Sequence, residues 1–386
     1  MTGVGVGDVH LAVPLVHDLV IVGAGRFANV AAEAWTRVPG VRVAAVADVQ
    51  VAAAQSLANS LGAATVGPDD VFSGNVAGPA YIATPPWTQH DFAARALRSG
   101  MHVVCEKPMG LTRAEVDDVA AIARASGRIA TVDFMQRHGP LATSVRRVVE
   151  EDVLGAPLHA YFENYAADED LPADHWFWDE RRSGGIFVEH AVHFFDLFRW
   201  WFGEGEVLSA TASTRKPTPK GTRTDQVACT TRHGNVLVHQ YHGFHQPNVL
   251  DRQTLGIVFE RGDIVLNGWI PVSATVRAVA DDRQLQRLHE LFPGTMTRHC
   301  DVPAGTRARG NAITAGEHVT IHTAQADKRS LYLRLLHARF TDAVAAMRDP
   351  THDQLVTVAD AAAAVDLAVR ASQAAGIASV QSAGGG

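Results

Sequence analysis

Residues 18–134 alternate short apolar runs with amphipathic stretches, and this alternation limits the possible folds more than any other feature of the chain. The run 19–22 has the length of a buried strand, whereas 26–37 has the spacing of a helix ended by Pro39-Gly40. Successive strand–helix–strand units form parallel sheets with helices on both faces. We therefore predict an α/β, doubly wound domain with strands near 19–22, 41–47, 80–83, 102–105 and 129–134.

The pattern changes after Arg137, where strand-like runs follow one another across short turns. Turns such as His233-Gly234-Asn235 join neighbouring strands directly, which predicts a second α/β region with an open, largely antiparallel sheet. Residues 280–320 show no clear pattern. We expect strands near 158–163, 207–213, 226–231, 236–241, 254–259 and 263–266, and helices near 141–151, 185–202, 328–347 and 358–375.

Composition argues against several classes of protein. With 47% apolar residues the 386-residue chain is not disordered, and its net charge of −7 disfavours binding to nucleic acid. No apolar run approaches the ~18 residues of a membrane span. The cysteines Cys105, Cys229 and Cys300 lie far apart, which favours neither a disulfide framework nor structural zinc. The cytoplasm is therefore the expected compartment.

A glycine-rich turn follows the first predicted strand. The segment Gly23-Ala24-Gly25-Arg26-Phe27-Ala28 has the G-x-G-x-x-G/A form that holds a dinucleotide pyrophosphate at a helix N-terminus. Asp48 ends the next strand, about 20 residues on, where a carboxylate binds the adenosine ribose. Its charge would repel a 2′-phosphate, so we expect NAD rather than NADP. The alternative role for Asp48 is a cap of the helix that begins at Val51.

Lys107 stands out because it is one of only four lysines in the chain. It lies in Cys105-Glu106-Lys107-Pro108, directly after a strand, at the carboxyl edge where doubly wound domains bind ligands. An ammonium group at this edge would hold a substrate hydroxyl and stabilise the alkoxide that develops as hydride leaves. The alternative is an ordinary solvated surface charge.

A polar stripe runs along the helix expected at 185–202. Glu189, His193 and Asp196 stand at i, i+4 and i+7 and share one face, and His190 meets His193 at i+3. Polar groups among so many aromatic residues are costly to bury unless they are hydrogen-bonded or used. We predict an active-site helix, with a hydrogen-bonded core stripe as the alternative. Zincins place two histidines at i and i+4 around the glutamate, so this pattern does not predict a metal.

Two further stretches are rich in ring side chains. Trp176 and Trp178 precede the polar helix, and their faces suit a sugar or cyclitol ring, with simple packing as the equal alternative. His239, His242 and His245 lie on or just after a strand. One of these three could reach the site, and the sequence does not indicate which.

Together these features resemble the Gfo/Idh/MocA oxidoreductase family, the relatives of glucose–fructose oxidoreductase and inositol dehydrogenase. The resemblance implies an N-terminal Rossmann domain and a C-terminal α/β domain whose open sheet often forms oligomers. It also implies oxidation or reduction of a ring CH–OH in sugars or inositols with NAD(P). It extends over 19–372 and rests on Gly23 to Ala28, Thr84-Pro85 with His90, Glu106-Lys107-Pro108, Arg137, and Glu189 through Asp196.

The resemblance further implies roles for single residues. Lys107 matches the family lysine at the substrate hydroxyl and nicotinamide ribose, His193 the catalytic histidine, and Glu189 the aspartate that positions the substrate. The family's Lys-Pro bond is often cis. We expect catalytic roles for Lys107, His193 and Glu189; cofactor contacts from Gly23, Gly25, Arg26, Phe27, Asp48, Thr84, Pro85, His90, Glu106 and Lys107; and substrate contacts from Lys107, Arg137, Trp176, Trp178, Glu189, His190 and His193.

These features predict an NAD-dependent oxidoreductase acting on a secondary ring hydroxyl or ketone of a sugar, sugar nucleotide or cyclitol. His193 would be a neutral base, because the start of a helix disfavours the imidazolium. The alternatives are an NAD-dependent hydrolase or lyase that oxidises its substrate transiently, and a non-catalytic NAD-binding regulator. We expect a flexible leader (1–17), an NAD-binding domain (18–137), a substrate-binding domain that forms a homo-oligomer through its sheet (138–376) and a flexible tail (377–386).

Overall fold

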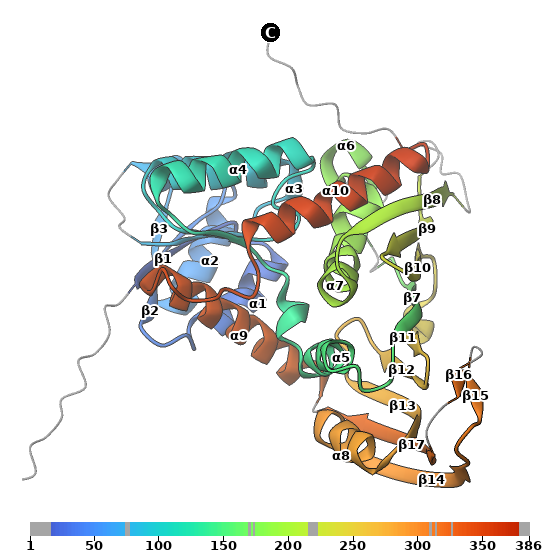
Figure 1. Ribbon diagram of the computed structural model, residues 1–386. Helices are drawn as coiled ribbons and strands as arrows, with labels where there is room; N and C mark the ends of the chain where they lie inside the picture. The colour runs from blue at the N-terminus through green and yellow to red at the C-terminus, as the bar shows by residue number, and fades with distance from the viewer. Residues whose placement is uncertain are drawn as a thin grey trace, which may run out of the picture.

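The computed structural model describes residues 17–73, 78–168, 171–172, 174–214, 223–308, 311–312, 315–325 and 327–377. Within these ranges the chain forms two large sheets, one in each half of the molecule (Figure 1). The predicted leader and tail lie outside the described residues, apart from His17 and Ile377.

The first sheet is parallel throughout, with strand order β3-β2-β1-β4-β5-β6, which confirms the predicted doubly wound fold. Its central strands are short apolar runs, buried on both faces by helices. The elements are β1 (His17–Val22), α1 (Arg26–Trp35), β2 (Val41–Ala47), α2 (Val51–Leu61), β3 (Ala64–Val66), β4 (Ala80–Ile82), α3 (Pro86–Arg98), β5 (Val103–Cys105), α4 (Arg113–Ser126) and β6 (Ala130–Val132).

The second sheet is mixed and mostly antiparallel, as predicted, with order β14-β17-β13-β12-β11-β7-β10-β9-β8. Only β7 and β10 run parallel to each other. The strands are β7 (Pro157–Ala166), β8 (Gly205–Ser213), β9 (Gln226–His233), β10 (Val236–Phe244), β11 (Arg252–Phe259), β12 (Gly262–Asn267), β13 (Ser273–Ala280), β14 (Thr295–Val302) and β17 (Gly316–Ala324), beside a short pair, β15 (Arg307–Ala308) and β16 (Asn311–Ala312).

Helices cover one face of this second sheet. Side chains alternate along β7, so that Phe162 and Asn164 point to the helices and Tyr161 points away. Leu141, Phe198 and Leu285 come from three different helices and join the inward strand residues in one core. These helices are α5 (Pro140–Glu150), α7 (Val192–Phe202) and α8 (Asp282–Leu291).

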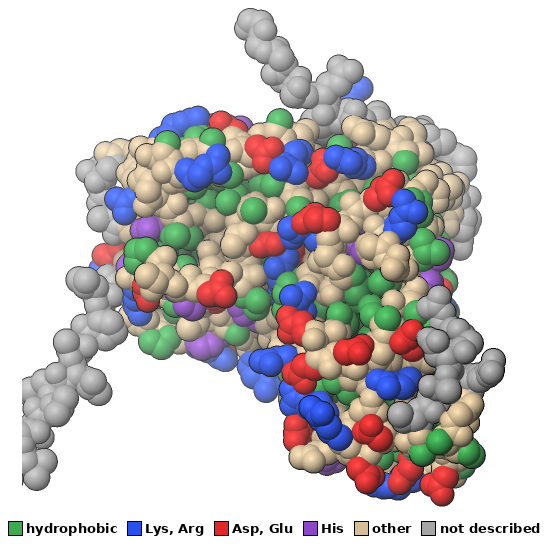
Figure 2. All heavy atoms as spheres, viewed as in Figure 1, with side chains coloured by type: hydrophobic (Ala, Val, Ile, Leu, Met, Phe, Trp, Pro, Cys, Tyr) green, Lys and Arg blue, Asp and Glu red, His purple; other side chains and the backbone are tan. Residues whose placement is uncertain are grey.

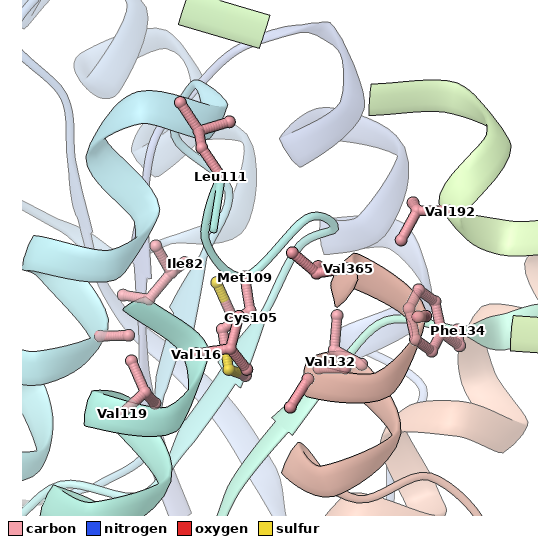
Figure 3. Packing of buried hydrophobic residues seen from close by; sticks show 14 of the residues in the cluster. Ile82, Cys105, Met109, Leu111, Val116, Val119, Val132, Phe134, Val192 and Val365 are labelled. Atoms are coloured by element: carbon pink, nitrogen blue, oxygen red, sulfur yellow. The ribbon is translucent and has the colours of Figure 1, made fainter. Parts of the chain in front are cut away.

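The last two helices, α9 (Lys328–Arg348) and α10 (Val358–Ala374), pack back against the parallel half. Phe340 of α9 stacks on Trp35 of α1 with ring centroids 4.0 Å apart. Val365 of α10 lies close to Val132, beside β6 (Figure 3), within a core that continues into α7. The two halves therefore meet along the carboxyl edge of the parallel sheet, and the division near residue 138 stays a prediction.

The surface carries both signs of charge. Figure 2 shows Lys and Arg side chains interleaved with Asp and Glu over the face in view.

Among the helices that the structure describes, none combines the length and apolar character needed to cross a membrane.

Candidate active site

The glycine turn lies where β1 meets α1. Gly23 has φ +102°, and a Cβ at this position would stand 2.4 Å from the Ala83 carbonyl oxygen just beyond β4. Only glycine fits this left-handed, crowded position. A Cβ on Gly25 would meet no atom within 4 Å, so open space lies above the N-terminus of α1. The turn thus has both the tight bend and the room that a pyrophosphate requires.

Asp48 is held by main-chain N–H groups beside this turn. Its Oδ2 accepts a hydrogen bond from Ala24 (2.7 Å), and its Oδ1 accepts one from Gln50 (2.7 Å). Gln50, not Asp48, is the N-cap of α2. Each carboxylate oxygen can accept a further bond. Next to Asp48, Val49 and Val51 are 82% and 67% exposed, an apolar surface beside a fixed carboxylate.

The other predicted cofactor residues lie in different environments. Thr84 follows β4 against the glycine turn, and its Oγ1 is buried without a hydrogen-bond partner. His90 instead bonds Asp118 of α4 (2.9 Å), and the Glu106 carboxyl is buried against the Tyr81 hydroxyl. Pro85 is the N-cap of α3, Arg26 is the exposed first residue of α1, and Phe27 packs against Tyr332 of α9.

Lys107 reaches from the parallel half to the polar helix of the other half. Its Nζ donates to Oε1 of Glu189 (2.7 Å) and to the Glu189 carbonyl oxygen (2.6 Å). Both side chains are largely buried, with 17% and 14% exposed. The Lys107–Pro108 peptide bond is cis, which confirms the expectation drawn from the family resemblance. The Lys107–Glu189 ion pair therefore fixes an ammonium group between the halves.

The helix predicted from about Gly185 differs in its opening turn. Residues Phe187–Ala191 form a π turn, and α7 begins only at Val192. Gly184 and Gly185, with φ of +77° and +79°, turn the chain into it. Single π turns inside helices occur often at functional sites. Here the π turn carries Glu189 and His190, and His193 follows in the first turn of α7.

His193 is a buried, neutral imidazole. Only 4% of the residue is exposed, and its ring meets Trp269 edge-on at 5.0 Å and Phe134 at 6.0 Å. Burial lowers the pKa of His193 well below its usual value, and the nearby Lys107 ammonium lowers it further. His193 also lies in the first turn of α7, where the predicted effect of a helix start would act in the same direction. Nδ1 of His193 has no hydrogen-bond partner.

His242 is the histidine of β10 that lies at the site. Its ring centroid is 5.3 Å from that of His190, and both Nδ1 of His242 and Nε2 of His190 are buried without partners. His239 is on the opposite face, where it bonds His159 (2.8 Å), and His245 lies near Tyr241. Strand alternation explains the difference, because His242 shares the inward face with Val238 and Gln240.

The two predicted tryptophans lie at the rim of this region. Trp176 contacts Trp87 of α3, with ring centroids 5.8 Å apart. Trp178 packs on Phe244, which itself contacts His190. Nε1 of Trp178 is buried without a partner, so it could donate a hydrogen bond to a ligand.

Arg137 is bound within the protein. Its Nε and Nη2 donate to the Asp196 carboxylate (2.8 and 2.5 Å), Nη2 also donates to Asp360 (3.0 Å), and Nη1 donates to the Leu355 carbonyl (3.0 Å). This buried guanidinium ties α7 to α10 beneath the site.

Among the described residues, no three His, Cys, Asp or Glu side chains gather as a metal-binding group.

Two family models match the chain. Residues 18–134 match the Gfo/Idh/MocA oxidoreductase family with its NAD-binding Rossmann fold, and residues 143–265 match the Gfo/Idh/MocA C-terminal domain. The first match covers the parallel sheet and its helices, and the second extends from α5 into β12.

Single proteins also resemble the chain. It is 27% identical over 198 residues to the scyllo-inositol 2-dehydrogenase (NAD(+)) of Bacillus subtilis, and 30% identical over 193 residues to the inositol 2-dehydrogenase of Rhizobium meliloti. Each alignment covers 50% of this chain, and the chain spans only 56% and 57% of these relatives.

Solved structures share the fold over nearly the whole chain. A levoglucosan dehydrogenase in complex with NADH and levoglucosan has a TM-score of 0.74 at 17% identity and covers 93% of this chain and 97% of its own. GenD2 from gentamicin A biosynthesis, in complex with NAD, has a TM-score of 0.71 at 19% identity, with 94% and 95% covered.

Proposed function

The chain belongs to the Gfo/Idh/MocA oxidoreductase family, and we propose that it transfers hydride between NAD and a secondary ring hydroxyl or ketone of a sugar, sugar nucleotide or cyclitol. The observation that carries this proposal is the Lys107–Glu189 ion pair beside the buried, neutral His193. An ammonium group and a neutral base at the carboxyl edge of a Rossmann sheet are what alcohol oxidation by a nicotinamide needs.

The residues at the glycine turn fit a dinucleotide. The open space above Gly25 would admit the pyrophosphate to the free N–H groups of α1. Asp48 would accept hydrogen bonds from the ribose hydroxyls, with the exposed Val49 and Val51 against the purine. Thr84 and Lys107 would lie at the nicotinamide end, because both follow strands at the same sheet edge.

The bound nicotinamide supplies the hydride acceptor in oxidation and the donor in reduction. His193 takes the proton of the substrate hydroxyl during oxidation and returns it during reduction. The ring is ready for this because burial keeps it unprotonated. Trp269 and Phe134 fix its plane from two sides.

Lys107 holds the oxygen at which negative charge develops. Its ammonium stabilises the alkoxide electrostatically, and the largely buried location strengthens this effect. Glu189 keeps the ammonium in place through two bonds and can accept a bond from a neighbouring substrate hydroxyl. Glu189 is therefore a positioning residue for both Lys107 and the substrate.

The lining of the site favours a ring with several hydroxyl groups. Four buried polar atoms of the site have no hydrogen-bond partner within the protein: Nδ1 of His193, Nε2 of His190, Nδ1 of His242 and Nε1 of Trp178. Hydroxyl groups of a substrate would supply hydrogen-bond partners for these atoms. Neutral hydroxyls do this without bringing a new charge into the buried region. Relatives named for inositol and levoglucosan support this substrate class.

The proposal is tested by incubating the protein with NAD and a panel of inositols, anhydrosugars, free sugars and sugar nucleotides while NADH absorbance is followed. We expect stoichiometric NADH with at least one of these compounds. Consumption of substrate without net NADH would instead indicate the hydrolase or lyase that regenerates its cofactor. Binding of NAD without turnover of any compound would favour a regulator.

We also propose a homo-oligomer formed through the outer face of the second sheet. Leu237 of β10 and Val258 of β11 are 41% and 37% exposed, and both pair in register with His159 of β7. Two exposed apolar side chains that flank His159 on one face of the sheet favour burial against a second copy. Light scattering at micromolar concentration should give a multiple of the chain mass, and Leu237→Glu should reduce it. A monomer mass for the unchanged protein would contradict this.

A further inference from the structure

A buried polar cluster lies directly behind the segment that carries Lys107, and the mechanism above does not use it. Tyr81 of β4, Glu106 after β5, Asp133 after β6 and Arg339 of α9 are each at least 92% buried. Polar side chains are buried at such depth only when they satisfy one another or serve the site. The four come from separate elements, so the cluster is a tertiary feature of this chain.

Hydrogen bonds connect the cluster across three neighbouring strands. The Tyr81 hydroxyl donates to Oε1 of Glu106 (2.5 Å), and the buried carboxyl groups of Glu106 and Asp133 lie close enough to interact electrostatically. Two neighbouring carboxyl groups at this depth repel strongly when both are ionised, which favours a proton on one of them. Arg339 donates to the Val132 carbonyl (3.0 and 2.8 Å), which places its charge near Asp133.

The charges decide which carboxyl group holds the proton. Burial raises the pKa of Glu106 well above its usual value, and the adjacent Asp133 raises it further. Burial also raises the pKa of Asp133, but the Arg339 guanidinium opposes this shift. A protonated Glu106 and an ionised Asp133 leave one negative charge opposite Arg339. Cys105 and Lys107 also face the pair, and Arg137 and Asp342 face Arg339.

The backbone bonds of the same segment complete a clamp. The Glu106 N–H donates to the Ile82 carbonyl (2.8 Å), and the Asp133 N–H donates to the Cys105 carbonyl (2.8 Å). The ends of β4, β5 and β6 are thereby tied together by both main chain and side chains. Lys107 follows Glu106 directly, and its side chain extends from this clamp to Glu189.

We propose that Glu106 acts as an uncharged carboxylic acid that positions Lys107, rather than as a charged ligand of the cofactor. Tyr81, Asp133 and Arg339 restrict the position of Glu106. The adjacent Lys107 is thereby ordered, with its ammonium directed to the substrate oxygen. The proposal rests on the proposed function for the role of Lys107. Its protonation state can be tested without any substrate.

Infrared spectroscopy of the whole protein at neutral pH provides that test. We expect a carbonyl band of a buried carboxylic acid that disappears in Glu106→Gln. Glu115→Gln is the matched control, because Glu115 accepts a bond from the nearby Leu111 N–H and should leave the band unchanged. Absence of the band in the unchanged protein, or its persistence in Glu106→Gln, would overturn the proposal.

Titration with NAD and turnover kinetics separate a positioning role from cofactor binding. Glu106→Gln should keep the Kd for NAD within about threefold, because glutamine still accepts from Tyr81 and donates to Asp133. Glu106→Ala should lower kcat at least ~tenfold with a similar Kd, and Glu106→Gln should restore most of that loss. A Kd raised tenfold or more in Glu106→Gln, or an unchanged kcat in Glu106→Ala, would contradict the role. If no compound of the panel is oxidised, the proposed function fails, whereas the infrared and NAD results still stand on their own.

Discussion

The proposed cofactor side and the proposed substrate side of the site are built in opposite ways. On the cofactor side, main-chain groups set the geometry, as where Asp48 accepts N–H bonds from Ala24 and Gln50. On the substrate side, side chains from distant elements converge, and several of their polar atoms have no partner within the protein. The Lys107–Glu189 pair joins the two sides.

A ligand would therefore have a different role on each side. The glycine turn is shaped by main-chain bonds, and the first N–H groups of α1 have no side-chain cap, so they can bind a pyrophosphate. The imidazoles of His190, His193 and His242 are buried with unpaired nitrogens, a costly state that hydroxyl groups of a substrate would relieve. Changes on the two sides should therefore affect different measured quantities.

The largest expected effect is on the substrate side. His193→Asn should lower kcat by about 10²–10⁴ because the proton acceptor is lost, while the Kd for NAD stays nearly unchanged. Lys107→Ala should also slow turnover, and the losses should be less than additive in the double variant because both residues act on one oxygen. His239→Asn is the matched control, since His239 lies on the opposite face of the sheet and should retain full activity.

Asp48 tests the cofactor side through specificity. Two unit charges ~4 Å apart at an effective dielectric of ~20 repel by about 4 kcal/mol before screening, so NADP should be used poorly. Asp48→Ser should raise kcat/KM with NADP by about 10–10² and lower it with NAD. Equal kcat/KM for the two cofactors in the unchanged protein would show that Asp48 does not face the ribose.

The two glycines of the turn separate folding from binding. Gly25→Val should leave the unfolding midpoint almost unchanged, because open space surrounds its Cβ, but weaken NAD binding by about tenfold or more. Gly23→Ala should instead destabilise the fold by about 1–3 kcal/mol, because of its positive φ and its contact with Ala83. Urea unfolding and NAD titration of both variants measure this contrast.

The buried histidines predict a graded loss of stability in acid. Burial lowers the pKa of His242 and His138 to about 3 and that of His102 to about 4, from an ordinary 6.5. The unfolded chain therefore binds more protons below pH 6.5, so their contribution is complete above that pH and is lost as pH falls towards the folded-state values. Each costs about 1.4 kcal/mol per pH unit in this window. Urea midpoints between about pH 7 and 5 should fall less steeply in His242→Gln than in the unchanged protein.

The parallel strands and the glycine turn could be predicted from the sequence because they depend on local pattern. The strands and the Gly23–Ala28 turn are short contiguous segments whose chemistry follows from backbone geometry. The β17 and β13 pairing was not predicted, because residues 280–320 show no clear periodicity. The π turn at Phe187–Ala191 was missed as well, since a helical period does not distinguish it from an α turn.

The substrate side depends on contacts that no local pattern encodes. Arg137 donates four hydrogen bonds: two to Asp196, one to Asp360 and one to the Leu355 carbonyl. The spacing of these residues in the sequence does not indicate this network. His242 could have been chosen over His239 and His245 from strand alternation alone, had the inward face of β10 been known. The acid pair of Glu106 and Asp133 needs the folded sheet to bring its strands together.

The most direct test of the account follows a deuterium label from substrate to cofactor. A polyol that the protein oxidises in the substrate panel is labelled with deuterium at its carbinol carbons. It is incubated with NAD and the protein, and the mass of the reduced cofactor is measured by mass spectrometry. The account predicts one deuterium in each NADH formed, with formation slowed in His193→Asn. Unlabelled NADH, or label that returns to the carbon of a cleaved product without net NADH, would contradict it.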